Sequence, residues 1–100
     1  MPAFALIFED DPVRPVADAL RLVHRDYFLG LGERATLGGP TFSEDGKVSG
    51  RLLVADFPSL DDARAWAEEE PLVKAGSSKL VKATAMVVAQ KDGKFTPVRG

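Results

Sequence analysis

The sequence contains no cysteine and only one histidine, His24. Without cysteine the chain has no disulfide, no thiolate nucleophile and no thiolate ligand for zinc. A single histidine leaves carboxylates to complete any metal site, and carboxylates suit hard cations better than transition metals. We therefore expect no bound transition metal. The lack of cysteine also fits a reducing compartment.

The sequence also lacks a long apolar run and an excess of positive charge. Its first apolar run, AFALIF at residues 3–8, is far shorter than the ~20 residues that cross a bilayer, and no basic segment of a secretory signal precedes it. The formal net charge of −2 argues against a partner with many phosphates. We expect a cytoplasmic protein that binds neither membrane nor nucleic acid.

The composition is that of an ordinary folded domain. The hydrophobic fraction is 45% and the charged fraction 28%, which excludes a disordered chain. One hundred residues suffice for one core, so we expect a single domain over residues 1–100.

The first half of the chain predicts a strand and a long helix. The unbroken apolar run at residues 3–8 indicates a central strand that is buried on both faces or nearly so. A helix of about five turns should follow to about Glu33, with Pro15 suited to its first turn and Gly30 and Gly32 ending it. The apolar face predicted for this helix consists of Val16, Leu20, Val23, Tyr27 and Leu31, with Ala17, His24 and Phe28 in the adjoining row.

The rest of the chain predicts three extended segments and a second helix. A strand beginning at Ala35 contains Gly-Gly-Pro, which places it at an edge or bends it. Asp45-Gly46 should turn the chain into an apolar strand at residues 50–57. Ser59 suits the N-cap of a helix that ends before Pro71. We expect a short turn at residues 72–76, a strand at 79–90, a turn at 92–93, and a tail or short strand after it.

The order β-α-β-β-α-β limits the possible topologies, because each β-α-β crossover must be right-handed. The simplest solution is an α+β ferredoxin-like sandwich, an antiparallel sheet with both helices on one face. The other face would expose apolar side chains from strands such as 52–57 and 80–88. A second copy of the chain would bury them, so we expect a homodimer through the open sheet face.

His24 and Glu70 are the leading candidates for chemistry. If the two helices run roughly parallel, both residues lie about 15 Å along them and therefore at the same height. Pro71 fixes the backbone of Glu70 and can aim its carboxylate inward, whereas Glu68 and Glu69 read as solvated surface. A carboxylate beside a histidine fixes its tautomer and suits acid–base catalysis. The alternative is a half-buried structural histidine with a satisfied hydrogen bond.

Further residues are candidates for ligand contacts. Tyr27 lies one turn after His24, and Ser43 and Arg51 flank the turn between the second and third strands. Gly38 and Gly39 either let a ligand approach the backbone or form a strained turn. Two glycines are too few for a phosphate-binding loop.

Two blocks of the sequence resemble the YCII-related (YciI-like) domain family, and the resemblance covers roughly residues 3–90. RLVHRDYFLGLGERATLGGP resembles its first helix and second strand, which ends in Gly-Pro, here Gly39-Pro40. GRLLVADFPSLDDARAWAEEEPLVKAG resembles its second half.

The resemblance implies a dimeric ferredoxin-like fold of the α+β barrel type and an active site built on a histidine and an aspartate. His24 matches that histidine. Glu70 stands where the family usually has Asp before Pro and an aromatic residue, and Leu72 replaces the aromatic. One branch of the family eliminates chloride from a chlorinated hydroxyhydroquinone.

The leading functional hypothesis is a small cofactor-free enzyme, lyase-like or hydrolase-like, that acts on a small and perhaps aromatic molecule. In this hypothesis His24 moves a proton and Glu70 orients and stabilises it, while Tyr27, Gly39, Pro40, Ser43 and Arg51 contact the substrate. One alternative is a module that binds a small ligand without chemistry. Another is a dimer that mainly contacts other proteins. The sequence leaves the substrate and the reaction open.

Overall fold

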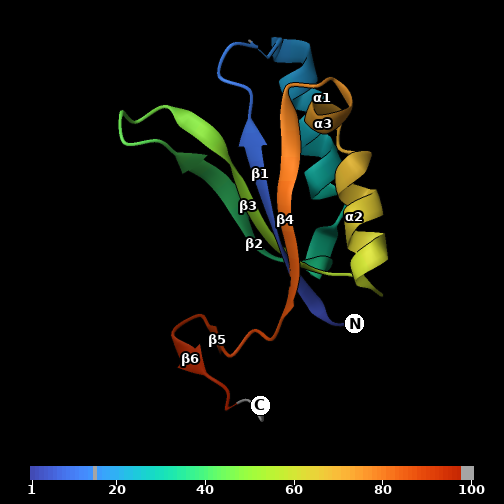
Figure 1. The fold of residues 1–100 in the computed structure, drawn as a ribbon. Helices are drawn as coiled ribbons and strands as arrows, with labels where there is room; N and C mark the ends of the chain where they lie inside the picture. Colours follow the sequence, from blue (N-terminus) through green and yellow to red (C-terminus); the bar gives the residue numbers. More distant parts are fainter. Residues whose placement is uncertain (15, 98–100) are drawn as a thin grey trace.

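The computed structural model describes residues 1–14 and 16–97, so the prediction for Pro15 lies outside the described residues. A four-stranded sheet, three α-helices on one face of it, and a separate two-stranded hairpin make up the fold (Figure 1). In chain order the elements are β1 (Ala3–Asp10), α1 (Asp18–Leu29), the 3₁₀ helix η1 (Gly32–Arg34), β2 (Ala35–Phe42), β3 (Val48–Asp56), α2 (Leu60–Glu68), α3 (Pro71–Lys74), β4 (Ser78–Met86), β5 (Gln90–Lys91) and β6 (Lys94–Phe95).

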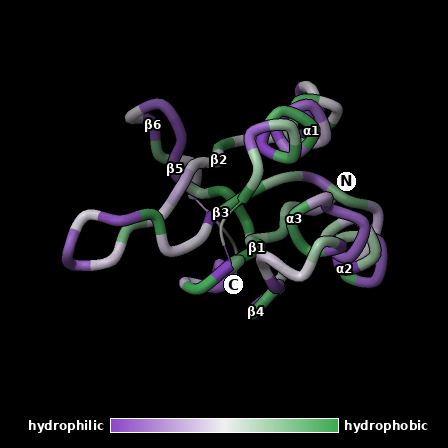
Figure 2. The backbone as a smooth tube through the Cα atoms, turned by 90° about the horizontal axis from the view of Figure 1, so that it is seen from above, coloured by the Kyte–Doolittle hydropathy of each residue, from purple (hydrophilic) through white to green (hydrophobic). Residues whose placement is uncertain are grey.

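The sheet has the strand order β2-β3-β1-β4, and every neighbouring pair is antiparallel. This order, with the helices gathered on one side of the strands (Figure 2), confirms the ferredoxin-like α+β fold. β1 is central, as predicted, and β2 with its Gly-Gly-Pro is an edge strand, as predicted. An edge position tolerates Pro40 because one side of the strand needs no ladder partner.

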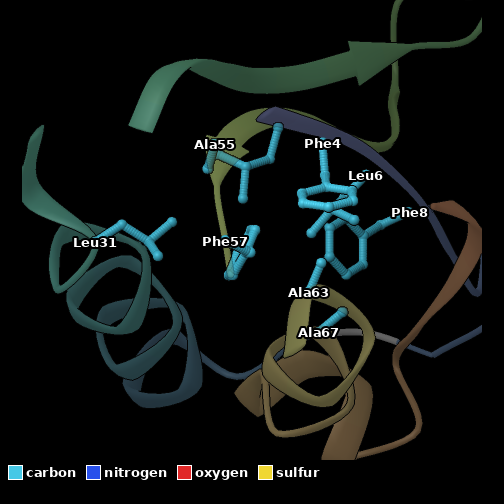
Figure 3. Packing of buried hydrophobic residues seen from close by; sticks show 9 residues of the cluster. Phe4, Leu6, Phe8, Leu31, Ala55, Phe57, Ala63 and Ala67 are labelled. Carbon is cyan, nitrogen blue, oxygen red and sulfur yellow. The ribbon is translucent and has the colours of Figure 1, made fainter. Parts of the chain in front are cut away.

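The core lies between the sheet and the helices. Phe4, Leu6 and Phe8 alternate along β1 and point toward the helix side (Figure 3). They pack with residues of β3 and the position after it, of α2 and of the segment after α1, namely Leu31, Leu53, Ala55, Phe57, Ala63 and Ala67. Ala5 and Ile7, on the opposite face of β1, are only half-buried. The prediction that β1 is buried on both faces was therefore wrong for its outer face.

Helix α1 is shorter than predicted and faces a different way. It begins at Asp18, because Ala17 is in extended conformation, and it ends at Leu29, after which Gly32 adopts a left-handed φ of 56°. Val23, predicted to face inward, is 54% exposed. No residue of α1 is fully buried, and its partly buried residues are Leu20, His24, Tyr27 and Phe28. The inward side of α1 therefore combines Leu20 and Tyr27 of the predicted face with His24 and Phe28 of the adjoining row, and Val23 lies outside it.

The two long helices run antiparallel, so the prediction that they are parallel was wrong (Figure 1). α1 follows β1 and α2 follows β3, and β1 and β3 are themselves antiparallel neighbours. Each helix runs antiparallel to the strand that precedes it in the chain. The start of α1 and the end of α2 consequently lie at the same end of the sheet.

The second half of the chain follows its local signals closely. Ser59 caps α2, and its Oγ accepts from the backbone N–H of Asp62 at 3.1 Å. The predicted turn at residues 72–76 begins instead as the one-turn helix α3, with Pro71 in its first turn. β4 ends at Met86, four residues earlier than predicted. Asp92 and Gly93, both with positive φ, turn the chain between β5 and β6.

The sheet face opposite the helices is apolar on β2 and β3 and partly polar on β4. Leu37 pairs with Val54 across β2 and β3, and Leu37 is 54% exposed. β4 contributes Met86 to this face, together with Lys82 and Thr84. Met86, Val81 and Val87 are exposed, as predicted for the segment 80–88. A 440 Å³ recess at this face lies among Leu37, Val54, Met86 and the segment 88–92.

No helix among the described residues has both the length and the apolar character needed to span a bilayer.

Candidate functional site

Glu70 is a fully buried carboxylate at the start of α3. As the N-cap residue it has extended backbone angles, and the following Pro71 holds it out of the preceding helix. Its Oε1 accepts from the N–H of Leu72 at 3.2 Å, and its Oε2 accepts from the N–H of Val73 at 3.3 Å. These backbone donors compensate part of the cost of burying a carboxylate.

His24 contacts this carboxylate from α1. Its Nδ1 forms a hydrogen bond with Oε1 of Glu70, which confirms the predicted proximity of the two residues. A carboxylate only accepts, so Nδ1 carries the proton and Nε2 of the neutral ring keeps a free lone pair. The ring lies 4.6 Å from the ring of Phe28, and the side chain retains 18% of its exposure.

Arg51 extends this pair into a network. Its Nη1 donates to Oδ1 of Asp10 at 3.1 Å, and its Nη2 donates to Oγ of Ser78 at 2.8 Å. The same Nη2 lies 3.7 Å from Oε2 of Glu70. Arg51 is 8% exposed and packs against the ring of Phe8 at 5.5 Å. The guanidinium therefore bridges two carboxylates, which keeps both charges compensated.

A wide, open hollow of about 1330 Å³ lies between α1 and strands β1 to β3. Five predicted site residues line it: His24, Gly39, Pro40, Ser43 and Arg51. Glu70 lies behind His24 with no exposed surface, so it acts on the hollow through the side chains of His24 and Arg51. Aromatic and apolar side chains, among them Phe8, Phe28 and Leu72, line the hollow as well. Such a mixture is usual in small-molecule sites.

Ser43 lies at the far rim of the hollow, in the turn between β2 and β3. Its Oγ donates a hydrogen bond to Asp45, and the N–H of Lys47 donates to the same carboxylate at 3.1 Å. These hydrogen bonds lower the pKa of Asp45, and the hydrogen bond from Ser43 has the largest effect. The hydroxyl is thus used in the turn predicted from Asp45-Gly46.

Tyr27 points away from the hollow. Its hydroxyl donates to the backbone carbonyl of Trp66 at 2.7 Å, and its ring stacks on the Trp66 ring at 4.8 Å. Burial, followed by the nearby charges of Glu69 and Glu70, raises the pKa of the phenol. The contacts of Tyr27 attach α1 to α2, and the residue is not among those that line the hollow.

The sequence reasoning missed Asp10 and Ser78, the partners of Arg51, and the two arginines Arg21 and Arg25, which line the hollow. Spacing could have found Arg21 and Arg25, because they share a helical stripe with His24. Asp10 and Ser78 carry no such signal, since strand pairing alone brings them to Arg51. Glu68 and Glu69 are exposed, as predicted.

The arrangement can accept and return one proton. Nε2 is the nitrogen of His24 that is not bound to Glu70, and the buried carboxylate stabilises the imidazolium that forms when Nε2 takes a proton. Within residues 1–14 and 16–97, no three His, Asp or Glu side chains gather in a way that could hold a metal ion.

The sequence pattern of the YCII-related domain matches residues 3–86. Among solved structures, 5-chloro-2-hydroxyhydroquinone dehydrochlorinase of Burkholderia phenoliruptrix AC1100, in complex with 2,5-dihydroxybenzoquinone, is similar to this chain with a TM-score of 0.61 and 22% identity. The match covers 85% of this chain and 91% of that one. At this identity the similarity shows a shared fold. No curated protein matches the sequence significantly.

Proposed function

We propose, from the premise that this chain belongs to the YCII-related domain family, that it is a small lyase-like enzyme that works by proton transfer at His24. The observation that carries the proposal is the pairing of His24 Nδ1 with the fully buried Glu70 while the ring borders the hollow. A histidine held in this way has a fixed tautomer and a free Nε2.

The proposed step is an elimination from a small hydroxylated molecule. The substrate reacts in the keto form of one hydroxyl, in which the hydroxyl proton has moved to the ring carbon that bears the leaving group and has made that carbon tetrahedral. Nε2 of His24 takes the proton of a second hydroxyl, and the oxygen electrons form a carbonyl double bond. The adjacent ring double bond shifts to the tetrahedral carbon, and the leaving group departs from it as an anion with the electron pair of its bond. Glu70 stabilises the imidazolium, which then returns its proton to water. The substrate loses one proton and one anion, so its elimination needs no electron acceptor and no redox cofactor. If water is the group activated by Nε2, the same pair supports hydrolysis.

The substrate class is taken from the structural relative, whose name states that it acts on a chlorinated hydroxyhydroquinone. Phe8 and Phe28 in the wall of the hollow suit a flat aromatic or quinone ring, and Gly39, Pro40 and Arg51 border the same space. Here Glu70 replaces the family aspartate. Its longer side chain still reaches His24, because α3 begins directly behind the imidazole.

The test is chloride release from 5-chloro-2-hydroxyhydroquinone and related chlorinated hydroquinones, measured by ion chromatography. We expect turnover by the unaltered chain and a loss of about 10²-fold to 10⁴-fold in His24→Gln, the range for a general acid–base residue. Arg64→Gln, an exposed change on α2, is the control and should retain full activity. Chloride release that survives His24→Gln would contradict the proposal.

A binding measurement beside the chloride assay separates the proposal from the two alternatives. Binding of 2,5-dihydroxybenzoquinone without turnover of any chlorinated hydroquinone would favour a ligand-binding module. Neither binding nor turnover would favour a protein whose role is to contact other proteins.

The proposal includes a homodimer formed through the open sheet face. Leu37 and Met86 are exposed there, and the recess beside them is a place that a second copy could fill. The cytoplasmic location stays a prediction.

A further inference from the structure

Four residues of α1 form a continuous stripe toward the hollow. Arg21, His24, Arg25 and Phe28 occupy positions i, i+3, i+4 and i+7, and all four line the hollow. The proposed base is therefore flanked by two guanidinium groups, with an aromatic ring one turn further on.

The two arginines are not neutralised within the part of the chain that the structure describes. No salt bridge or side-chain hydrogen bond there involves Arg21 or Arg25, and both are exposed. Like charges four residues apart on a helix repel each other and weaken it. Arg51, the other arginine near His24, is bound instead to Asp10 and approaches Glu70.

The four carboxylates that border the hollow make no ion-pair contact with Arg21 or Arg25 among the described residues. Asp10 accepts from Arg51, Asp11 accepts from the N–H of Val13, and Asp45 accepts from Ser43 and Lys47. Glu9, the fourth, lies opposite Lys79 in the register of β1 and β4. Among the described residues, Arg21 and Arg25 of the α1 wall thus form no ion pair with these carboxylates and stay available to an anion in the hollow.

From these contacts we infer that the hollow selects a small planar anion, a carboxylate or an ionised enol or phenol, whose charge is held by Arg21 and Arg25 while its ring lies against Phe28. A bound anion would remove the repulsion between the two guanidinium groups and place the ring next to Nε2 of His24. This inference rests on the proposed function, since it assigns the substrate class of the same hollow.

A matched pair of ligands tests the inference. 2,5-Dihydroxybenzoate and 2,5-dihydroxybenzamide have nearly the same shape, but only the first is an anion. Calorimetry should show that the benzoate binds about tenfold tighter, as expected for a charge-assisted contact with arginine. Binding should also perturb the ring signals of His24, which is the single histidine of the chain and needs no assignment. Added salt should weaken the benzoate more than the amide.

The variants Arg21→Gln and Arg25→Gln should each weaken the binding of the benzoate several-fold and leave the affinity for the amide unchanged. The double variant should bind both ligands equally well. Arg64→Gln removes an exposed arginine from α2 and should change neither affinity. Thermal melting without ligand checks that the variants fold, and it should show no loss of stability because a repulsive pair is removed.

The outcomes separate this inference from the proposed function. Equal binding of both ligands at His24 overturns the anion preference but leaves the hollow as a ligand site. The same holds if benzoate affinity survives in the double variant. If neither ligand perturbs the His24 signals while chlorinated hydroquinones are turned over, the inferred substrate class is wrong, but the proposed enzymatic activity stands. Absence of both binding and turnover overturns both proposals.

Discussion

The imidazole of His24 and the carboxylate of Glu70 are in contact although 46 positions separate them in the chain. Glu70 has two roles in this contact: it caps α3 through the N–H groups of Leu72 and Val73, and it fixes the proton of His24 on Nδ1. The placement of the candidate base is therefore tied to a local helix-capping motif.

Glu70→Gln should reverse the tautomer of His24. The N–H groups of Leu72 and Val73 bind different oxygens of Glu70, and the glutamine has only one acceptor oxygen. That oxygen should stay on the side of Val73, where Arg51 also lies, so the NH₂ group replaces Oε1 and donates to Nδ1 of His24. Nitrogen NMR of the single histidine should find the neutral ring protonated at Nδ1 in the original chain and at Nε2 in the variant. Weaker capping should also cost about 1 kcal/mol in the free energy of unfolding.

Glu69→Gln is the matched control, because Glu69 is adjacent but exposed and pairs with Lys74. It should change neither the tautomer nor the stability by more than about 0.5 kcal/mol. A Glu70→Gln variant whose histidine keeps the original tautomer would remove Glu70 as its partner.

The fold was predictable because its signals are local. The apolar run of β1, Ser59 before α2 and Asp45-Gly46 between β2 and β3 each specify an element through neighbouring residues alone. The face of α1 was not predictable in this way. Its apolar period includes Val23, which is exposed on the outer side of the helix, whereas the polar residues Arg21 and Arg25 line the hollow.

Only part of the candidate site was predictable, namely the pair of His24 and Glu70. His24 and Glu70 were identified correctly as neighbours, but through the wrong premise of parallel helices. Antiparallel pairing of β1 with β3 reverses one helix and brings the end of α2 to the start of α1. Asp10 and Ser78 join Arg51 through the registers of three strands, and residue spacing carries no information about strand register.

Gly50→Ala should destabilise the sheet where Arg51 and Asp10 meet. A Cβ at Gly50 would lie 1.9 Å from the carbonyl oxygen of Phe8, so β1 and β3 would have to separate. We expect a loss of about 3 kcal/mol in urea-induced unfolding, the upper end for overpacking. At Gly39 a Cβ meets no atom within 4 Å, so Gly39→Ala should stay within about 0.5 kcal/mol. Equal losses would show that the approach of β1 to β3 is not the cause.

Tyr27 should make the protein lose stability in alkali. Its pKa is raised in the folded state by burial and by Glu69 and Glu70, above the ordinary value of 10.0. The stabilisation is therefore complete below pH 10 and is lost as the pH rises through the folded value. Since Tyr27 is the only tyrosine, phenolate absorbance should give a midpoint above that of the urea-unfolded chain.

Tyr27→Phe provides the check on this cause. The variant loses the hydrogen bond to the carbonyl of Trp66, which should cost about 1 kcal/mol at neutral pH. Its stability should then decline less steeply above pH 10 than that of the original chain. An identical alkaline decline in both proteins would assign the loss to other groups.

The proposed homodimer makes a prediction that distinguishes the two faces of the molecule. Leu37 on the open sheet face and Val23 on the outer side of α1 are both 54% exposed. A lysine at either position should therefore change the stability of a monomer only slightly and by a similar amount. If a second copy covers the sheet, Leu37→Lys places an unpaired charge in an apolar interface, whereas Val23→Lys stays in water. Sedimentation at micromolar concentration should give twice 10.8 kDa for the original chain and for Val23→Lys, and a monomer for Leu37→Lys. A monomeric original chain would remove the dimer, and a dimer disrupted only by Val23→Lys would move the interface to the helices.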